Sequence, residues 1–233
     1  MKLNLVHKYF EGFISLFYPK VCLACASSLL GNEDIICTSC RISLPVTEFH
    51  LSPGNPVEKI FWGRIPVENA TSLLFFDKGS KYRHLLHQLK YHGKKEVGHF
   101  LGKILGKCLS ETNFDLIDLI VPIPLHPAKL RRRGFNQSEE IALGIANIMK
   151  KPIARHALKR NVHSSSQTFK SRYDRWENTK GIFAILEPEL FRNKHILLVD
   201  DIVTTGATLE AAGSVILNIE GARLSIATLA FTY

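Results

Sequence analysis

The 233-residue chain lacks any long, uncharged apolar run. No stretch approaches the roughly 18 residues that a membrane-spanning helix requires, so we expect no membrane partner. The N-terminus also lacks the pattern of a secretory signal, because Lys8 and Glu11 interrupt the segment that would have to be apolar. Cysteines number only five, and there is no internal repeat or low-complexity segment. We therefore expect a cytoplasmic globular protein without a disulfide framework.

Acidic residues are scarce in one part of the chain. The sequence has 30 Lys and Arg residues and 21 Asp and Glu residues, which gives a formal net charge of +9. Residues 126–185 hold 13 of the basic residues and only four of the acidic ones, whereas the rest of the chain has 17 of each sign. The whole excess lies in this stretch and predicts an anionic partner, either a phosphate-rich small molecule or nucleic acid. A solvated basic face is the alternative.

Apolar spacing along the chain alternates between the periods of helices and strands. Residues 4–18 have helical spacing and predict a helix that docks on the core, and the prolines between 43 and 68 predict an irregular connector. The predicted strands cover residues 72–76, 116–122, 195–199 and 223–231, and the predicted helices cover residues 80–91, 94–109, 137–150 and 207–219. Strands that alternate with helices predict an α/β fold with a mainly parallel sheet.

Four of the five cysteines form two C-x-x-C pairs. Cys22 and Cys25 are separated from Cys37 and Cys40 by eleven residues. Four thiolates around one Zn²⁺ ion make a closed tetrahedral site, which is structural because no position is left for water. The spacing predicts a zinc site that supplies folding free energy to a segment too small for its own core. Unbound or redox-active thiols are the alternative, and Cys108 is expected to be a buried core residue.

Two adjacent carboxylates, Asp200 and Asp201, follow the apolar run at residues 195–199. A small, hydroxyl-rich loop precedes the next predicted helix, and its candidate residues are Thr204, Thr205, Gly206, Ala207 and Thr208. Ligands of open α/β sheets lie at the carboxyl ends of strands, and the N–H groups at a helix N-terminus attract phosphate. The carboxylates can accept hydrogen bonds from vicinal hydroxyls or lie near Mg²⁺. The segment predicts a ribose 5-phosphate site, with an ordinary Asp-rich turn before a capped helix as the alternative.

Several motifs together resemble one known family. Residues 196–208 are similar to the phosphoribosyl-diphosphate (PRPP) binding signature of type I phosphoribosyltransferases. Further motifs narrow the resemblance to the ComF family, which includes the GntX-type proteins; they are the C-x-x-C pairs, LKYHG at 89–93, VPIPL at 121–125, RRGFNQ at 132–137 and QT at 167–168. The resemblance runs from about Phe17 to the C-terminus, which is nearly the whole chain.

The resemblance implies a division of the chain and roles for its residues. It implies an N-terminal helix and zinc-ribbon module over residues 1–52, a connector over residues 53–68, and a type I phosphoribosyltransferase fold over residues 69–233. It also implies that the two carboxylates contact the ribose hydroxyls, that residues 204–208 hold the 5-phosphate, and that Mg²⁺ accompanies PRPP. Residues 121–125 occupy the likeliest place for the pyrophosphate-binding loop of such enzymes.

Three adjacent guanidinium groups, those of Arg131, Arg132 and Arg133, would repel one another without a nearby anion. With Lys90 they are candidates for binding pyrophosphate, where the arginines could close as a lid over the leaving group. They could equally bind a nucleic-acid backbone. Lys90 could instead complement a helix dipole, because it lies near the end of a predicted helix.

Two other polar features allow more than one interpretation. Asn136 either caps the helix that begins at residue 137 or contacts a ligand. Basic and aromatic residues are interleaved between residues 163 and 180, a pattern that binds nucleic acid, closes an active site or packs a surface loop.

These features leave three hypotheses for function. The first is an enzyme that transfers a phosphoribosyl group from PRPP, with Mg²⁺, to an unidentified acceptor and releases pyrophosphate. The second, implied by the ComF resemblance, is a non-catalytic protein that handles single-stranded DNA during natural competence and DNA uptake, together with proteins of the competence machinery. The third is a PRPP-sensing regulator that has the fold without the chemistry.

Overall fold

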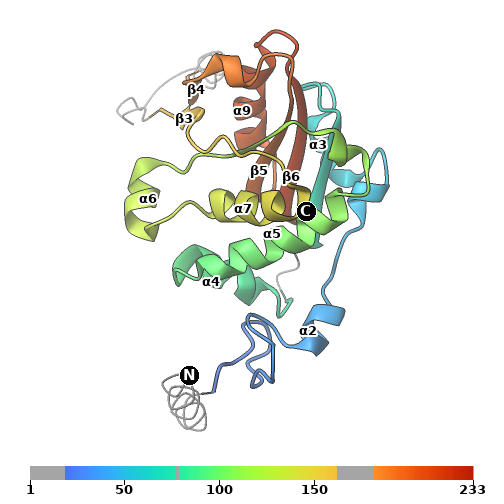
Figure 1. Cartoon of the computed structure of the whole chain (residues 1–233), viewed down its shortest axis with the longest axis vertical. Helices are drawn as coiled ribbons and strands as arrows, with labels where there is room; N and C mark the ends of the chain where they lie inside the picture. The colour runs from blue at the N-terminus through green and yellow to red at the C-terminus, as the bar shows by residue number, and fades with distance from the viewer. Residues whose placement is uncertain (1–18, 77–78, 162–180, 233) are drawn as a thin grey trace, which may run out of the picture.

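The computed structural model describes residues 19–76, 79–161 and 181–232. Its centre is a four-stranded parallel sheet in the order β1-β6-β5-β2, built from β1 (Asn69–Phe75), β6 (Arg223–Phe231), β5 (His195–Val203) and β2 (Leu119–Pro122). Figure 1 shows the sheet in the upper part of the molecule and the cysteine-containing segment, in blue, at the lower end. The predicted α/β fold with a parallel sheet is therefore confirmed.

The sheet is buried on both faces, as its apolar strands require. Four successive residues of β5 point alternately to the two faces of the sheet, as side chains of a strand do. Leu197 and Val199 pack into the core on one face, and Ile196 and Leu198 pack into the core on the other. A parallel sheet covered on both sides in this way explains the continuous apolar runs of its central strands.

Helices cover both faces of the sheet. The first face carries α4 (Arg83–Tyr91), α5 (Lys95–Leu109) and α7 (Gln137–Met149), and the second carries α3 (Pro56–Phe61) and α9 (Ala207–Leu217). The backbones of α5 and α7 approach so closely that a Cβ at Gly102 would collide with the carbonyl oxygen of Ile141. This contact fixes α7, whose N-terminus is part of the site described below. The four helices predicted from periodicity are confirmed to within a few residues.

The segment predicted to be irregular between residues 43 and 68 contains two short helices, η1 (Phe49–Leu51) and α3. That prediction was wrong over residues 56–61. The side-chain oxygen of Asn55 accepts hydrogen bonds from the N–H groups of Val57 and Glu58, and Pro56 occupies the first helical turn. A proline there favours a helix rather than breaking it, because its missing N–H has no acceptor to lose. Asn55 Nδ2 also donates to the carbonyl oxygen of Ala70, which ties α3 to β1.

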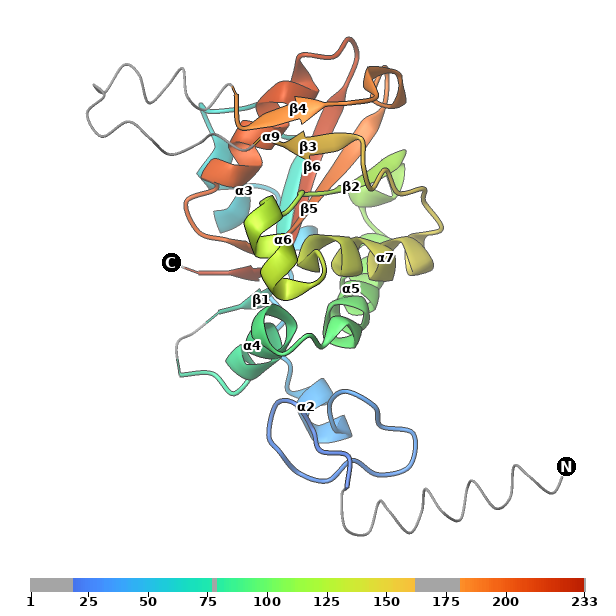
Figure 2. The same cartoon turned by 90° about the vertical axis from the view of Figure 1, so that its left-hand side faces the viewer.

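The cysteine-containing segment is attached to the rest of the fold by its apolar side chains. It consists of a turn closed by an antiparallel bridge between Val21 and Ser28, followed by α2 (Thr38–Ile42). Cys22, Ile36 and Cys40 belong to the same buried cluster as residues of α4 and α5. Figure 2 shows α4 lying between this segment and the sheet domain.

The other elements are short. They are η2 (Asn113–Leu116), α6 (Pro127–Arg133), η3 (Pro188–Leu190) and a two-stranded antiparallel sheet of β3 (Leu158–Arg160) and β4 (Phe183–Ile185). The strand predicted over 116–122 begins only at residue 119, since the Thr112 side chain caps η2 before it. The predicted helix at 4–18 and the basic, aromatic stretch at 163–180 lie outside the described residues. Within the described part of the chain, no helix is long and apolar enough to cross a membrane.

Candidate functional site

The two predicted carboxylates lie at the carboxyl end of β5. The strand continues past its predicted end at residue 199, through Asp200 and Asp201, to Val203, and Asp200 pairs with Thr228 of β6. The hydroxyl-rich loop follows immediately, and α9 begins at Ala207. The structure therefore brings the carboxylates and the loop together in the predicted order of strand, loop and helix.

Two helices contribute side chains that contact the carboxylate pair. Lys90 Nζ, in the last turn of α4, lies 3.0 Å from Asp201 Oδ2. Ser138 Oγ, in the first turn of α7, donates to Asp200 Oδ1 at 2.8 Å. The Lys90 and Asp201 side chains are only 20% and 13% exposed, so water screens this ion pair weakly. Lys90 was predicted to bind an anionic ligand, and in this structure its partner is a carboxylate of the protein.

The environment of Asp200 favours the neutral carboxyl group. Removal from water, and secondly repulsion by the Asp201 carboxylate, raise the pKa of Asp200 to about 7. Hydrogen bonds from the Asp201 N–H and from the Ser138 hydroxyl, together with the charge of Lys90, oppose this rise in the pKa. Asp200 therefore takes up and releases its proton near neutral pH. A bound cation would favour the fully ionised pair.

The loop between β5 and α9 forms a small, polar hollow. The hollow has a volume of about 70 Å³ and is lined by Asp200, Ile202, Val203 and residues 204–209. No side chain caps the N-terminus of α9, so the N–H groups of its first turn have no acceptor from a capping side chain. Within the described residues, the hydroxyls of Thr204, Thr205 and Thr208 make no hydrogen bond and are available as donors. This arrangement suits an anion.

Gly206 takes a backbone conformation that its neighbours require. Its φ is +73°, in the left-handed region, and a Cβ at this position would lie 2.5 Å from Ile60 Cγ2 and 3.0 Å from Phe61 Cε1. Only glycine meets both conditions without strain. The loop is therefore packed closely against α3, the helix that the sequence analysis missed.

Arg64 is a second feature that sequence reasoning missed. Its Nη1 donates to the Thr205 carbonyl oxygen at 2.7 Å and to the Ile60 carbonyl oxygen at 3.1 Å, and its Nη2 pairs with Glu210 of α9. The guanidinium thus joins α3, the loop and α9. Because 141 residues separate Arg64 from Thr205, no local sequence pattern could have indicated this contact.

The arginine stretch forms a helix end rather than a loop. Arg131, Arg132 and Arg133 are the last turn of α6, and Gly134 follows with a φ of +78°. Arg133 Nη1 donates to Gln137 Oε1 at 2.8 Å, while Arg133 Nε and Gln137 Nε2 are buried without a hydrogen-bond partner among the described residues. Unpaired buried donors are costly unless a ligand supplies an acceptor. Gln137 lies in the first turn of α7 beside Ser138, which contacts Asp200, and Arg133 reaches it from the end of α6.

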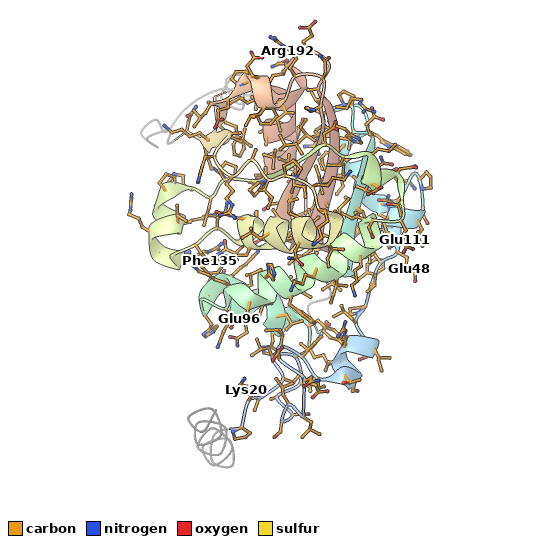
Figure 3. All side chains as sticks on the ribbon, in the orientation of Figure 1. Lys20, Glu48, Glu96, Glu111, Phe135 and Arg192 are labelled. Atoms are coloured by element: carbon orange, nitrogen blue, oxygen red, sulfur yellow. The ribbon has the colours of Figure 1, made fainter. Side chains whose placement is uncertain are left out.

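Asn136 fulfils the capping role predicted for it. Its Oδ1 accepts from the Ser138 N–H at 3.2 Å, and its Nδ2 donates to the Ile123 carbonyl oxygen at 2.9 Å. These bonds connect the start of α7 to the loop after β2, the segment that the family resemblance implied for pyrophosphate. Figure 3 labels the preceding residue, Phe135, at the junction of α6 and α7, where its ring is buried. The N-terminus of α7 therefore contacts both the loop after β2, through Asn136, and the carboxylate pair, through Ser138. The arginines at the end of α6 precede this N-terminus in the chain.

An exposed aromatic and basic surface flanks this region. The Arg133 guanidinium lies 5.6 Å from the centre of the Tyr91 ring. The ring of His87 lies 4.7 Å from that of Tyr91 and 5.2 Å from that of His92. Tyr91 is 61% exposed, and α4 and α6 lie beside each other (Figure 2). We call these four residues the α4–α6 aromatic surface.

The four predicted metal ligands converge. The Sγ atoms of Cys22, Cys25, Cys37 and Cys40 all lie within 4.8 Å of one another. Four sulfurs bound to one Zn²⁺ ion would be about 3.8 Å apart, since each Zn–S bond is about 2.3 Å long. The 3.7 Å between Cys25 Sγ and Cys37 Sγ matches this value. The cluster could hold a metal such as zinc.

The protonation of these thiols differs from one ligand to the next. Hydrogen bonds, the largest from Ser27, lower the pKa of Cys25 to about 6. Burial, reinforced by the neighbouring thiols, raises the pKa of Cys40 to about 12. A buried thiol of this kind becomes a thiolate only when a cation compensates its charge, so a metal ion fits the donor set. The fifth cysteine, Cys108, is half-buried against the core, and burial raises its pKa as well.

Comparison with known proteins agrees with this architecture. Residues 136–232, which include α7, β5, α9 and β6, match the family model described as the phosphoribosyl transferase domain. These residues therefore have the fold of that domain. The domain's matched region covers both carboxylates, the loop after β5 and the start of α7. The expected type I phosphoribosyltransferase fold, with a four-cysteine cluster at its N-terminal side, is therefore confirmed.

Relatives match most of the chain. DNA utilization protein YhgH of Escherichia coli (strain K12) is 28% identical over 209 residues, which are 88% of this chain and 87% of that protein. Competence protein ComFC of Bacillus subtilis (strain 168) is 26% identical, with 84% of this chain and 88% of that protein covered. Competence protein F of Haemophilus influenzae is 27% identical over 54% of this chain and 57% of that protein. The ComF resemblance inferred from the motifs is confirmed.

Proposed function

We propose that this chain binds PRPP, or a related ribose 5-phosphate, at the carboxyl end of β5. The observation that carries the proposal is the direct succession of Asp200 and Asp201, the uncapped N-terminus of α9 and the free hydroxyls of the loop between them. The loop would hold the 5-phosphate, and the carboxylates would accept hydrogen bonds from the ribose hydroxyls. The buried, unpaired donors on Arg133 and Gln137 would face the pyrophosphate, together with Arg131 and Arg132.

The same residues could support phosphoribosyl transfer. In that reaction the bond between C1 of the ribose and the pyrophosphate oxygen breaks as an acceptor forms its bond to C1, and the electron pair leaves with the pyrophosphate. The protein's part is to position PRPP and to stabilise the charge that develops on the leaving group, which the guanidinium groups at the end of α6 would do. Asp200 and Asp201 are oxygen ligands of the type that Mg²⁺ takes, and the ion would neutralise charge on PRPP.

Calorimetric titration of Mg²⁺–PRPP tests this proposal. We expect saturable binding to the wild-type protein and a loss of at least tenfold in affinity for Asp200→Asn/Asp201→Asn, because the diol loses both charged acceptors. The matched control is Glu111→Gln/Asp115→Asn, which removes two exposed carboxylates, one before η2 and one within it, and should bind like the wild type. Equal affinity in all three proteins, or no binding to any, contradicts the proposal. Release of pyrophosphate on addition of an acceptor base then distinguishes an enzyme from a PRPP sensor.

The α4–α6 aromatic surface favours a second candidate function, the handling of single-stranded DNA. Exposed rings stack on unpaired bases, and the neighbouring cations Lys94, Lys95, Arg131 and Arg132 are exposed and could contact phosphates. Relatives whose names refer to DNA utilization and competence support this candidate and suggest partners in the competence machinery. Here the phosphoribosyl transferase fold would be a binding module without turnover.

Binding of a fluorescent oligothymidylate tests the second candidate. We expect affinity that falls steeply between 50 mM and 200 mM salt, because phosphate contacts release counterions. Tyr91→Ala should weaken binding by roughly tenfold, since one base–aromatic stack contributes about 1–3 kcal/mol. Trp62→Ala removes an equally exposed ring on the opposite side of the sheet domain and is the control. If the affinity changes neither with salt nor in Tyr91→Ala, the α4–α6 aromatic surface is not the DNA-binding site.

We also propose that the metal held by the four cysteines is zinc. The sulfur ligand set, the Sγ separations and the closed arrangement support it. Elemental analysis of protein purified without chelators should find one zinc per chain. A different metal, or none, contradicts the assignment.

A further inference from the structure

One helix joins the metal centre to the carboxylate pair. The hydroxyl of Tyr82, the residue that precedes α4, donates to the Cys40 carbonyl oxygen at 2.9 Å, and Ser43 Oγ lies 2.8 Å from the same hydroxyl. At the other end of α4, Lys90 Nζ lies 3.0 Å from Asp201 Oδ2. A helix of nine residues spans about 13 Å and transmits a displacement of one end to the other.

The body of α4 depends on the cysteine-containing segment for its apolar contacts. Leu85, Leu86 and Leu89 are between 0% and 3% exposed and belong to one buried cluster with Cys22 and Cys40. A nine-residue helix is not stable by itself, so α4 requires this packing to keep its place. The segment in turn has little core of its own, because α2 contains only five residues and a single buried side chain. Metal at the cysteines is therefore what would hold the surface against which α4 packs.

Among the described residues, Lys90 alone supplies a positive charge in contact with the carboxylate pair. It is the one cation that forms an ion pair with Asp200 or Asp201 among the described residues. Its charge attracts the Asp201 carboxylate and opposes the rise in the pKa of Asp200. Displacing α4 by one or two ångströms would weaken this pair, because Lys90 belongs to the last turn of that helix and its partner lies at the end of β5.

We propose that Lys90 is a positioning residue for the carboxylate pair and that its position depends, through α4 and Tyr82, on metal bound at the four cysteines. The metal centre then acts on the ligand site without touching the ligand. By thermodynamic linkage, a ligand that needs the ionised pair should also tighten metal binding. Only the effect on ligand binding rests on the proposed ribose phosphate function. The coupling between the metal centre and Lys90 does not depend on any ligand.

Hydrogen–deuterium exchange tests the coupling without any ligand. On removal of the metal by a chelator, we expect exchange to become at least tenfold faster over residues 83–91 and also faster over residues 200–208, while β6 keeps its protection. Faster exchange confined to residues 19–47 would overturn the proposal.

A variant studied with metal bound tests the coupling even if the metal-free protein unfolds. Tyr82→Phe, studied with metal bound, removes only the hydroxyl that contacts Cys40 and Ser43. It should speed exchange of both segments by about three- to tenfold, the range expected for the loss of hydrogen bonds that this hydroxyl makes. Tyr91→Phe deletes a hydroxyl from the same helix at a position remote from the cysteines and should change neither segment. Tyr82→Phe that exchanges like the wild type would also overturn the proposal.

The affinity for Mg²⁺–PRPP reports on Lys90 itself. Lys90→Met should weaken binding by roughly three- to tenfold, because it removes the charged partner that holds the Asp201 carboxylate in place. Lys90→Arg retains a cation and should restore the affinity, which a merely structural role would not require. Unchanged affinity for Lys90→Met refutes the positioning role. Absence of PRPP binding by the wild type would refute the proposed function, and the exchange experiment would still decide the coupling.

Discussion

Ser138 donates its hydroxyl proton to Asp200 Oδ1 at 2.8 Å and so joins the first turn of α7 to the end of β5. The bond does not suffice to ionise Asp200, because burial and the Asp201 carboxylate raise the pKa from 3.8 to about 7. A carboxyl group whose pKa is raised by folding stabilises the fold in its protonated form. That stabilisation is present below pH 4 and is lost as the pH rises through 7.

Asp200→Asn removes this titration and retains an oxygen that can accept from Ser138. We therefore expect the melting temperature of the variant, relative to that of the wild type, to increase between pH 5 and about pH 7 and then to level off toward pH 8. Thermal denaturation at four pH values in this range measures the difference. Asp115→Asn, on an exposed carboxylate, should give a constant difference. A constant difference for Asp200→Asn as well would show that the carboxyl group titrates below this range.

Arg64→Ala should weaken the binding of Mg²⁺–PRPP without unfolding the protein. The guanidinium fixes the loop between β5 and α9 through the Thr205 carbonyl oxygen. One hydrogen bond contributes about 0.5–1.5 kcal/mol, which corresponds to roughly two- to twelvefold in affinity. Arg192→Ala is the control, because Arg192, like Arg64, forms ion pairs with acidic residues, in this case Glu189 and Glu220, but lies away from the loop. Equal affinities for the two variants would mean that the loop keeps its shape without Arg64.

The carboxylates, the loop and the cysteines could be predicted because each is a short, local pattern. The contacts that complete the site could not. Ser138 lies 62 residues from Asp200, and Arg64 lies 141 residues from Thr205, so only the packing of α7 and α3 on the sheet brings them together. Helix α3 was missed because its prolines were interpreted as breaks, whereas Asn55 and Pro56 together start a helix.

Gly206→Ala should destabilise the fold through two separate effects. A non-glycine residue at a φ of +73° costs about 1–3 kcal/mol, and the new Cβ would also lie 2.5 Å from Ile60 Cγ2. For a chain of this size, each 1 kcal/mol corresponds to a fall of roughly 2–4 °C in melting temperature. Gly134→Ala separates the effects, because Gly134 has a φ of +78° and no atom within 4 Å of an added Cβ. Gly206→Ala should therefore have the lower melting temperature of the two variants. Equal melting temperatures would show that α3 moves to admit the new Cβ without loss of stability.

Removing the metal should destabilise more than the cysteine-containing segment itself. The buried thiol of Cys40 has a pKa near 12, so metal loss returns a proton to a site that shares its apolar cluster with α4. We expect chelation, or Cys25→Ser, to lower the melting temperature by roughly 10 °C. Cys108→Ser deletes a half-buried thiol that is not one of the four clustered cysteines and should leave the metal content at one ion per chain. If Cys25→Ser retains both its metal and its melting temperature, the exposed Cys25 is not a ligand, and the three remaining thiols would have to hold the ion with an open coordination position.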